Sequence, residues 1–139
     1  MEKLSASLED YLEVIYNNGE AVRAVDIARE LNVSRASVAE ALSKLEDKEL
    51  IERLNNTITI TDMGLNIAKD VVCRHSSLSS FFEDVLGASH ELAEENACRI
   101  EHIISAEMLD RLQAFVKFTR NDAEFIQEFK KFYMENLDK

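Results

Sequence analysis

Three residues of metal-ligand type stand close together in the second half of the chain. Cys98, Glu101 and His102 occupy positions i, i+3 and i+4 of one segment. On a helix such positions share one face, so the thiol, the carboxylate and the imidazole would leave it together. These groups suit a first-row divalent transition metal. The alternative is a polar helix edge with a buried cysteine, which behaves as a small hydrophobe.

The element that carries these residues is expected to be a helix, because the whole composition favours helices. The 139 residues include no proline and three glycines, and 46% of them are hydrophobic. Few residues therefore interrupt a helix, and the length suffices for one ordinary core or two small ones. We expect a mostly α-helical protein.

Neither a membrane span nor a signal peptide is visible. No apolar run reaches the length of about 18 residues that a span needs, and the first residues lack a basic start and an apolar core. We therefore expect a soluble, cytoplasmic protein with no membrane partner. In that compartment the two cysteines, Cys73 and Cys98, are thiols or metal ligands rather than a disulfide.

The net charge of −11 argues at first sight against binding to nucleic acid, because phosphate contacts need lysine and arginine. Residues 1–72 are themselves acidic, with 8 Lys and Arg against 14 Asp and Glu. DNA binding would have to depend on local geometry, or on a bound cation that cancels negative charge.

The first half of the chain carries a helix-turn-helix pattern over residues 23–45. A short helix over 24–31 leads through Asn32 and Val33 to Ser34, which can cap a second helix. A recognition helix meets DNA with the outward positions near its N-terminus. Those positions here are Arg35, Ala36, Ser37, Ala39, Glu40 and Ser43. The alternative is an αα-hairpin within a helical bundle.

The following segment favours DNA binding over the hairpin alternative. Ile58 and Ile60 alternate with threonines, as in a half-buried strand, and Asn55-Asn56 suits a tight turn. A helix-turn-helix followed at once by two strands is a winged helix. Arg53 is the one cation in residues 50–61 and would lie along the DNA backbone.

Two domains follow from this order of elements: a winged-helix DNA-binding domain over 1–72 and a helical domain over 73–139. Helices are expected over 5–18 and from 62 to at least 74, and then over 91–104, 105–119 and 122–136. Phe125, Phe129 and Phe132 fall on one stripe of the last helix. So small a domain cannot bury all its apolar side chains, so we expect a homodimer.

In its motifs the chain resembles the diphtheria toxin repressor family of metal-dependent transcriptional regulators, over nearly its whole length. Residues 7–16 resemble the opening helix of the manganese regulators, residues 73–75 the segment with a ligand histidine, and residues 97–102 the ligand helix of the iron-type repressors. The resemblance implies these metal ligands: Asp10, Glu13, His75, Cys98, Glu101 and His102. From residue pattern alone, Asp10 and Glu13 would be an ordinary solvated acidic face, and His75 an incidental helix histidine.

The departures from the family pattern make the chain a hybrid. Iron-type members typically have Met at the position of Asp10, and manganese-type members have Glu at the position of Cys98. At the ancillary site of the iron-type members, Ser79 replaces a glutamate, and Glu94 is a further candidate ligand close to the position of a histidine. We expect the two-domain architecture of the manganese regulators, without an SH3-like third domain.

The resemblance implies a repressor that senses Fe(II) or Mn(II), with Co, Ni or Zn as surrogates, and controls metal-homeostasis genes. One or two ions would balance the carboxylates, tie the two domains together and fix the spacing of two recognition helices on a pseudo-palindromic operator. One alternative is a metal-free regulator that senses oxidants through Cys73 or Cys98. A metallohydrolase is the other, but no H-E-x-x-H motif supports it, and we expect no enzyme.

Overall fold

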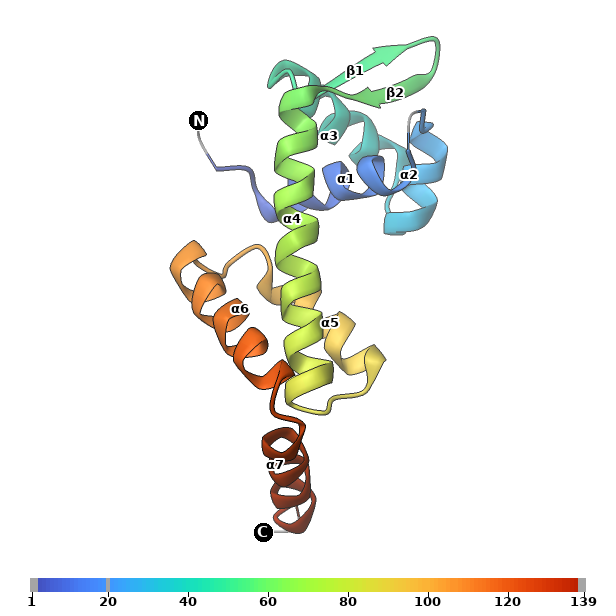
Figure 1. Cartoon of the computed structure of the whole chain (residues 1–139). Helices are drawn as coiled ribbons and strands as arrows, with labels where there is room; N and C mark the ends of the chain where they lie inside the picture. The colour runs from blue at the N-terminus through green and yellow to red at the C-terminus, as the bar shows by residue number, and fades with distance from the viewer. Residues whose placement is uncertain (1–2, 20, 138–139) are drawn as a thin grey trace. The chain divides into compact units, whose positions relative to one another are not determined.

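The computed structural model describes residues 3–19 and 21–137 and divides into two compact units, Met1–Val72 and Cys73–Lys139 (Figure 1). The first unit contains α1 (Ala6–Asn17), α2 (Ala24–Leu31), α3 (Arg35–Asp47), β1 (Ile51–Leu54) and β2 (Thr57–Ile60). The helix α4 (Asp62–Ser80) begins in the first unit and ends in the second. The second unit continues with η1 (Phe81–Val85), α5 (His90–Ile100), α6 (Ala106–Arg120) and α7 (Ala123–Glu135). The predicted fold class, mostly helical with a two-stranded wing, is confirmed.

Local capping explains the helix-turn-helix of the first unit. Asn32 ends α2 in the left-handed conformation, with φ of 52°. Ser34 then caps α3, because its hydroxyl accepts a hydrogen bond from the backbone N–H of Ser37 at 3.1 Å. The turn and the start of the recognition helix therefore lie where the sequence predicts them.

The wing is a tight antiparallel hairpin. Ile51 pairs with Ile60 and Leu54 with Thr57, and both turn residues, Asn55 and Asn56, have positive φ. Positive φ at both central positions is the requirement of a type I′ turn, which asparagine tolerates. The hairpin is therefore specified by its two-residue turn and by the alternation of β2.

Gly64 lets the first turn of α4 pack closely against the end of α3 and the wing. A Cβ at this position would lie 2.1 Å from the backbone oxygen of Leu50, a distance no side chain can occupy. The side chain of Thr61 accepts a hydrogen bond from the Gly64 N–H at 3.1 Å and so caps this helix. The start of α4 is thereby fixed to the buried core of the first unit.

The segment after α4 is a π-helical turn that the sequence analysis does not predict. In η1 the N–H of Leu86 bonds to the oxygen of Phe81 at 3.2 Å, a spacing of five residues. Gly87, at φ of 72°, then ends the helix in the left-handed conformation. The chain can therefore reverse before Ser89 caps α5.

The predicted helix over 91–104 is wrong at its C-terminal end, because α5 stops at Ile100. Ile103 bonds back to Ile100 in a three-residue turn, and Ser105 caps α6. Glu101 keeps helical dihedral angles as the C-cap, whereas His102 lies in the turn. The face shared by Cys98, Glu101 and His102, here called the triplet, therefore extends from α5 into the turn that follows it.

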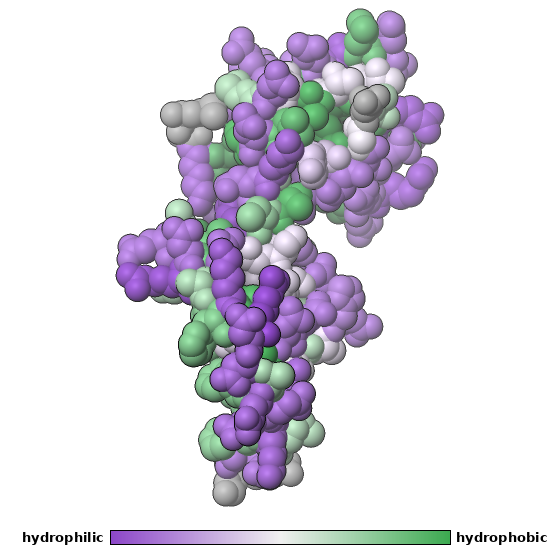
Figure 2. Space-filling view, in the orientation of Figure 1, coloured by the Kyte–Doolittle hydropathy of each residue, from purple (hydrophilic) through white to green (hydrophobic). Residues whose placement is uncertain are grey.

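Large apolar side chains are exposed on the second unit, and Figure 2 shows hydrophobic surface over its C-terminal helices. They include Met108, Phe115, Phe118, Phe125, Phe132 and Tyr133, and none of the described residues of α7 is buried. Among the described residues, no helix combines the length and the apolar character needed to cross a membrane.

Candidate metal centre and nucleic-acid interface

His75 is the centre of the side-chain cluster in the second unit. Its Nδ1 lies 2.7 Å from Oε2 of Glu101, and its Nε2 lies 3.0 Å from Oε2 of Glu94. His75 comes from α4, whereas both carboxylates come from α5 and its C-cap. Both nitrogens of one imidazole therefore face carboxylates from the neighbouring helix.

The other two members of the triplet, Cys98 and His102, contact the pair formed by His75 and Glu101. The Sγ of Cys98 lies 3.8 Å from Nδ1 of His75, and Nε2 of His102 lies 3.2 Å from Oε1 of Glu101. The structure thus brings four of the residues singled out in the sequence together within one unit: His75, Cys98, Glu101 and His102. A thiol, a carboxylate and two imidazoles form a ligand set for a divalent transition metal.

The cluster is built to hold positive charge. Glu101 is only 1% exposed, and a buried carboxylate is costly unless it is paired. Burial disfavours the protonated form of His75, but its hydrogen bonds to Glu94 and Glu101 outweigh that effect and raise its pKa. Because metal ligands must be deprotonated, a bound cation would replace protons here. The donor set therefore fits a divalent metal.

Arg74, the neighbour of His75 on α4, holds the backbone of the triplet. It is buried, and its Nη1 donates a hydrogen bond to the main-chain oxygen of Glu101 at 2.6 Å. This contact fixes the point at which α5 ends, and with it the carboxylate of Glu101. Arg74 is thus a positioning residue that the sequence analysis does not identify.

Glu94 lies on the far side of the imidazole from Glu101. Its Oε2 faces Nε2 of His75, whereas Glu101 and Cys98 lie at Nδ1. Hydrogen bonds from Ser79, at 2.5 Å, and from His75 lower the pKa of Glu94. If a metal binds Nδ1 of His75, Glu94 would accept a hydrogen bond from Nε2 and so fix the orientation of the ring.

The two candidates from the first unit, Asp10 and Glu13, lie on α1. Both are half-buried, while Tyr11, Leu12 and Val14 beside them are buried in the core. They are three residues apart, so they share a face of the helix. The first unit therefore offers two carboxylates at one-turn spacing, anchored by the core residues between them.

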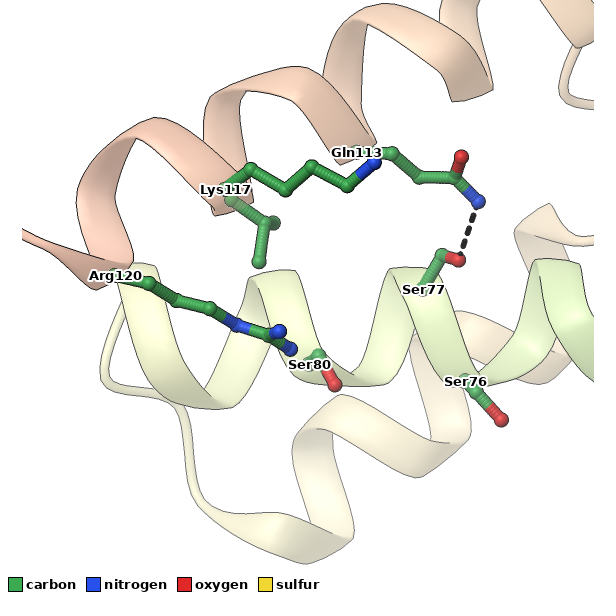
Figure 3. Close-up of a pocket in the computed structure, with 7 residues that line it drawn as sticks. Ser76, Ser77, Ser80, Gln113, Lys117 and Arg120 are labelled. Atoms are coloured by element: carbon green, nitrogen blue, oxygen red, sulfur yellow. Dashed lines mark hydrogen bonds between the residues drawn. The ribbon is translucent and has the colours of Figure 1, made fainter.

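A separate pocket of about 330 Å³ lies in the second unit, between α4 and α6 (Figure 3). Gln113 donates a hydrogen bond to Ser77 across it at 2.8 Å. Lys117 and Arg120 line it together with Ser76 and Ser80, and no carboxylate or imidazole lines it. These cations would repel a metal, so the pocket is not part of the metal centre.

In the first unit, the predicted DNA-contacting residues lie on the surface. Arg35, Ala36, Ser37 and Ser43 on α3 are all exposed. A groove of about 560 Å³ lies between α3 and the wing and is lined by Arg23, Arg35 and Arg53, among others. Three guanidinium groups thus line one groove of this acidic unit, and phosphate contacts need such cations.

Arg23 is a candidate for DNA contact that the sequence analysis does not include. It is the N-cap residue of α2, and its Nε donates to Oδ2 of Asp26 at 3.2 Å on the exposed surface. Its position directly before the first helix of the motif could have indicated a DNA contact from the sequence. Its place beside the wing is not visible in the sequence, because it depends on how the hairpin folds back.

Arg53 on the wing is tied to α3 by an ion pair with Glu46. Its Nε donates to Oε2 of Glu46 at 2.8 Å, and its Nη2 reaches the same oxygen. The hydrogen bond to Arg53 lowers the pKa of Glu46. A phosphate that contacts Arg53 would therefore compete with Glu46, so Arg53 is a weaker candidate than a free cation.

Comparison with protein families finds two domain matches along the chain. Residues 3–55 match the N-terminal DNA-binding domain of the iron-dependent repressors, and residues 61–128 match their metal-binding and dimerisation domain. An uncharacterised HTH-type transcriptional regulator of Methanocaldococcus jannaschii is 32% identical over 119 residues, which cover 82% of this chain and 95% of that protein. The HTH-type transcriptional regulator MntR of Oceanobacillus iheyensis is 31% identical, over 94% of this chain and 90% of its own.

Solved structures are similar as well. A manganese-dependent transcriptional repressor in complex with manganese superimposes with a TM-score of 0.74 at 28% identity, over 80% of this chain and 53% of that one. The repressor ScaR with bound Zn²⁺ gives a TM-score of 0.70 at 29% identity, over 80% of this chain and 54% of that one. The chain thus spans about half the length of these two solved repressors.

Proposed function

Because the chain belongs to the iron-dependent (diphtheria toxin) repressor family of metal-dependent, DNA-binding transcriptional regulators, we propose that a divalent metal held by six of its side chains controls its binding to DNA. It is a regulator and not an enzyme. The observation that carries the proposal is that Cys98 and Glu101 both lie at Nδ1 of His75, while His102 lies at the other carboxylate oxygen of Glu101. The ligands in this proposal are Asp10, Glu13, His75, Cys98, Glu101 and His102.

The chain's own residues supply the switch. Glu101 is buried and needs a cation or a proton near it, while Arg74 and Glu94 hold the ligands in place. Asp10 and Glu13 of the DNA-binding unit would complete the ligand set of the second unit. A bound ion supplies positive charge and coordination bonds between the two units, which favours the arrangement that binds DNA. In this proposal the chain works in the cytoplasm on metal-homeostasis genes.

The test is DNA binding by the full chain with and without metal. DNA fragments are selected from a random-sequence pool by the protein in excess Mn²⁺ or Fe²⁺ without oxygen, and their affinity is then measured with metal and with chelator. We expect selective binding that is lost with chelator and restored by metal. Binding that survives chelator but responds to peroxide would instead favour a thiol sensor, since Cys73 and Cys98 are exposed thiols outside any disulfide.

A prediction on DNA contact concerns the start of the recognition helix. Arg35→Ala should weaken binding to the selected DNA by about tenfold or more, because an arginine contact to a base is worth roughly 1–3 kcal/mol. Metal affinity should stay nearly unchanged, because Arg35 is exposed and lies outside the proposed ligand set. Both affinities are measured by titration of the same preparation.

The control for this variant is Lys48→Ala, which removes the same charge from the C-cap of α3 rather than from its start. We expect Lys48→Ala to bind DNA much more nearly as the unmodified chain does. If Arg35→Ala lowers metal affinity along with DNA affinity, Arg35 is structural and the proposed interface is wrong.

A second prediction concerns self-association. The matched dimerisation domain and the exposed aromatic side chains of α6 and α7 support a homodimer through these helices. The full chain should therefore have roughly twice its mass of 15.8 kDa at micromolar concentration, even without metal. Phe118→Glu, at a position 66% exposed, should shift it toward monomer.

Light scattering after gel filtration measures both masses. The matched control is Leu54→Glu, because Leu54 is a similarly exposed apolar residue, at 72%, but lies on the wing. That variant should remain dimeric. A monomeric unmodified chain would remove the basis for recognition of a pseudo-palindromic operator.

A further inference from the structure

We propose that the second unit holds a second divalent-cation site, formed by Glu83, His90 and Glu94. Glu83 lies in η1, His90 is the first residue of α5, and Glu94 lies one turn later on the same helix. Each side chain offers one ligand atom, and these atoms all lie within 4.8 Å of one another. Two carboxylate oxygens and one imidazole nitrogen suit Mn²⁺, Fe²⁺, Co²⁺ or Zn²⁺.

The carboxylates of Glu83 and Glu94 both lie close to the hydroxyl of Ser79. The hydroxyl of Ser79 lies 2.5 Å from Oε1 of Glu94 and 3.2 Å from Oε1 of Glu83. Ser79 is buried and has one hydroxyl proton, so it can donate to one of the two carboxylates at a time. Like charges at this range repel, so the pair favours a positive charge beside it, which either a protonated histidine or a metal ion can supply.

His90 completes the set from the side that faces solvent. Its Nδ1 lies 2.8 Å from Oε1 of Glu83, while its side chain is 75% exposed. An ion between the three ligand atoms could therefore keep water in its remaining coordination positions. The exposure also gives the ion a direct route from solvent.

The local backbone explains why residues from two elements meet. The π turn of η1 places Glu83 beyond Ser79 on the same side of the helix, and Gly87 then reverses the chain. Ser89 caps α5, so that His90 and Glu94, four residues apart, share the face toward Glu83. The sequence holds all three residues, but only this turn brings them together.

The site goes beyond the proposed function, because Glu83 and His90 are not among the six proposed ligands. Glu94 links the two sites: its Oε1 faces Ser79, and its Oε2 faces Nε2 of His75. In iron-type members of the family, the ancillary metal site has a glutamate where this chain has Ser79. In the site proposed here the carboxylate lies one turn further along, at Glu83, and the imidazole lies one turn before Glu94, at His90.

Anaerobic titration of the full chain with Co²⁺ tests the site, with heat and visible absorption recorded together. The variants are the single substitution His90→Ala and the double substitution Glu83→Gln with His90→Ala. The matched control is Glu91→Gln, which changes an exposed acid in the same turn of α5. We expect both variants to lose one of the Co²⁺ equivalents bound by the unmodified chain, or to bind it at least about tenfold more weakly. Glu91→Gln should keep that equivalent.

Absorption separates this site from the metal centre. Co²⁺ beside Cys98 would give thiolate-to-metal absorption, whereas the ligands Glu83, His90 and Glu94 include no thiol. That absorption should therefore persist in both variants. Its absence from the unmodified chain would count against Cys98 as a ligand, while an equivalent that still depends on His90 would support the second site.

The proposal is overturned if both variants bind as many equivalents of Co²⁺ as the unmodified chain, with the same affinities. His90, Glu83 and Ser79 would then form only a hydrogen-bonded network. Thermal unfolding without metal, followed by circular dichroism, shows whether the variants keep their fold. The exposed position of His90 makes the single variant the safer of the two in this respect.

Discussion

Asp10→Ala should abolish metal-dependent DNA binding while the chain keeps its fold and its dimer. Asp10 is half-buried on α1, and the first unit owes its core to Leu12, Ile15 and other apolar residues rather than to this carboxylate. In the proposed switch Asp10 is one of two ligands that tie the DNA-binding unit to the metal. Without it, metal can still bind in the second unit but no longer favours the DNA-binding arrangement.

The measurement is affinity for the selected DNA at saturating metal and with chelator, for both proteins. An allosteric ligand typically changes affinity by about 5- to 150-fold, and we expect this stimulation to vanish in Asp10→Ala. Asp47→Ala, which removes an exposed carboxylate at the end of α3, should keep it. If Asp10→Ala still responds to metal in full, the first helix does not carry the switch.

The winged helix is predictable from sequence because its signals are local. A cap at Ser34, a left-handed position at Asn32 and the pair Asn55-Asn56 each specify the backbone within a few residues. The second strand alternates threonine with isoleucine, and Ile58 is its buried residue. None of these features needs knowledge of distant parts of the chain, so α2, α3 and both strands agree with the prediction.

What the sequence could not show depends on contacts between distant residues. The π turn at Phe81–Val85 and the early end of α5 follow from packing and from the Arg74–Glu101 contact, which joins residues 27 positions apart. The pairing of Arg53 with Glu46 needs the wing to fold back on α3. Spacing alone also leaves open how deeply Glu101 is buried.

The metal centre is partly predictable from local sequence and partly dependent on contacts between distant residues. Helical spacing predicts that Cys98 and Glu101 share a face, and in the structure both lie at Nδ1 of His75, a residue that the family resemblance singles out. Glu94, the further candidate ligand, faces His75 with one carboxylate oxygen and Ser79 with the other. Which residues bind metal stays a prediction that the variants above test.

Cys98→Glu should shift the metal preference toward Mn²⁺. A thiolate is softer than a carboxylate and favours Fe²⁺, Co²⁺ and Zn²⁺, whereas Asp10 and Glu13 are hard oxygen ligands that Mn²⁺ tolerates well. With one thiol in the set, we expect Fe²⁺ to be the better activator of the unmodified chain, with Mn²⁺ close behind. The Sγ of Cys98 lies 3.8 Å from Nδ1 of His75, so a longer glutamate can reach the same centre.

The variant should bind DNA better with Mn²⁺, relative to Fe²⁺ or Co²⁺, by about tenfold or more, which corresponds to roughly 1.4 kcal/mol. Affinity for the selected DNA is measured without oxygen at limiting and saturating concentrations of each metal. Cys73→Ser is the matched control, since it removes the other exposed thiol and should leave the ratio of Mn²⁺ to Fe²⁺ activation unchanged. The same unchanged ratio in Cys98→Glu would mean that Cys98 does not touch the metal, and the hybrid ligand set would have to be abandoned.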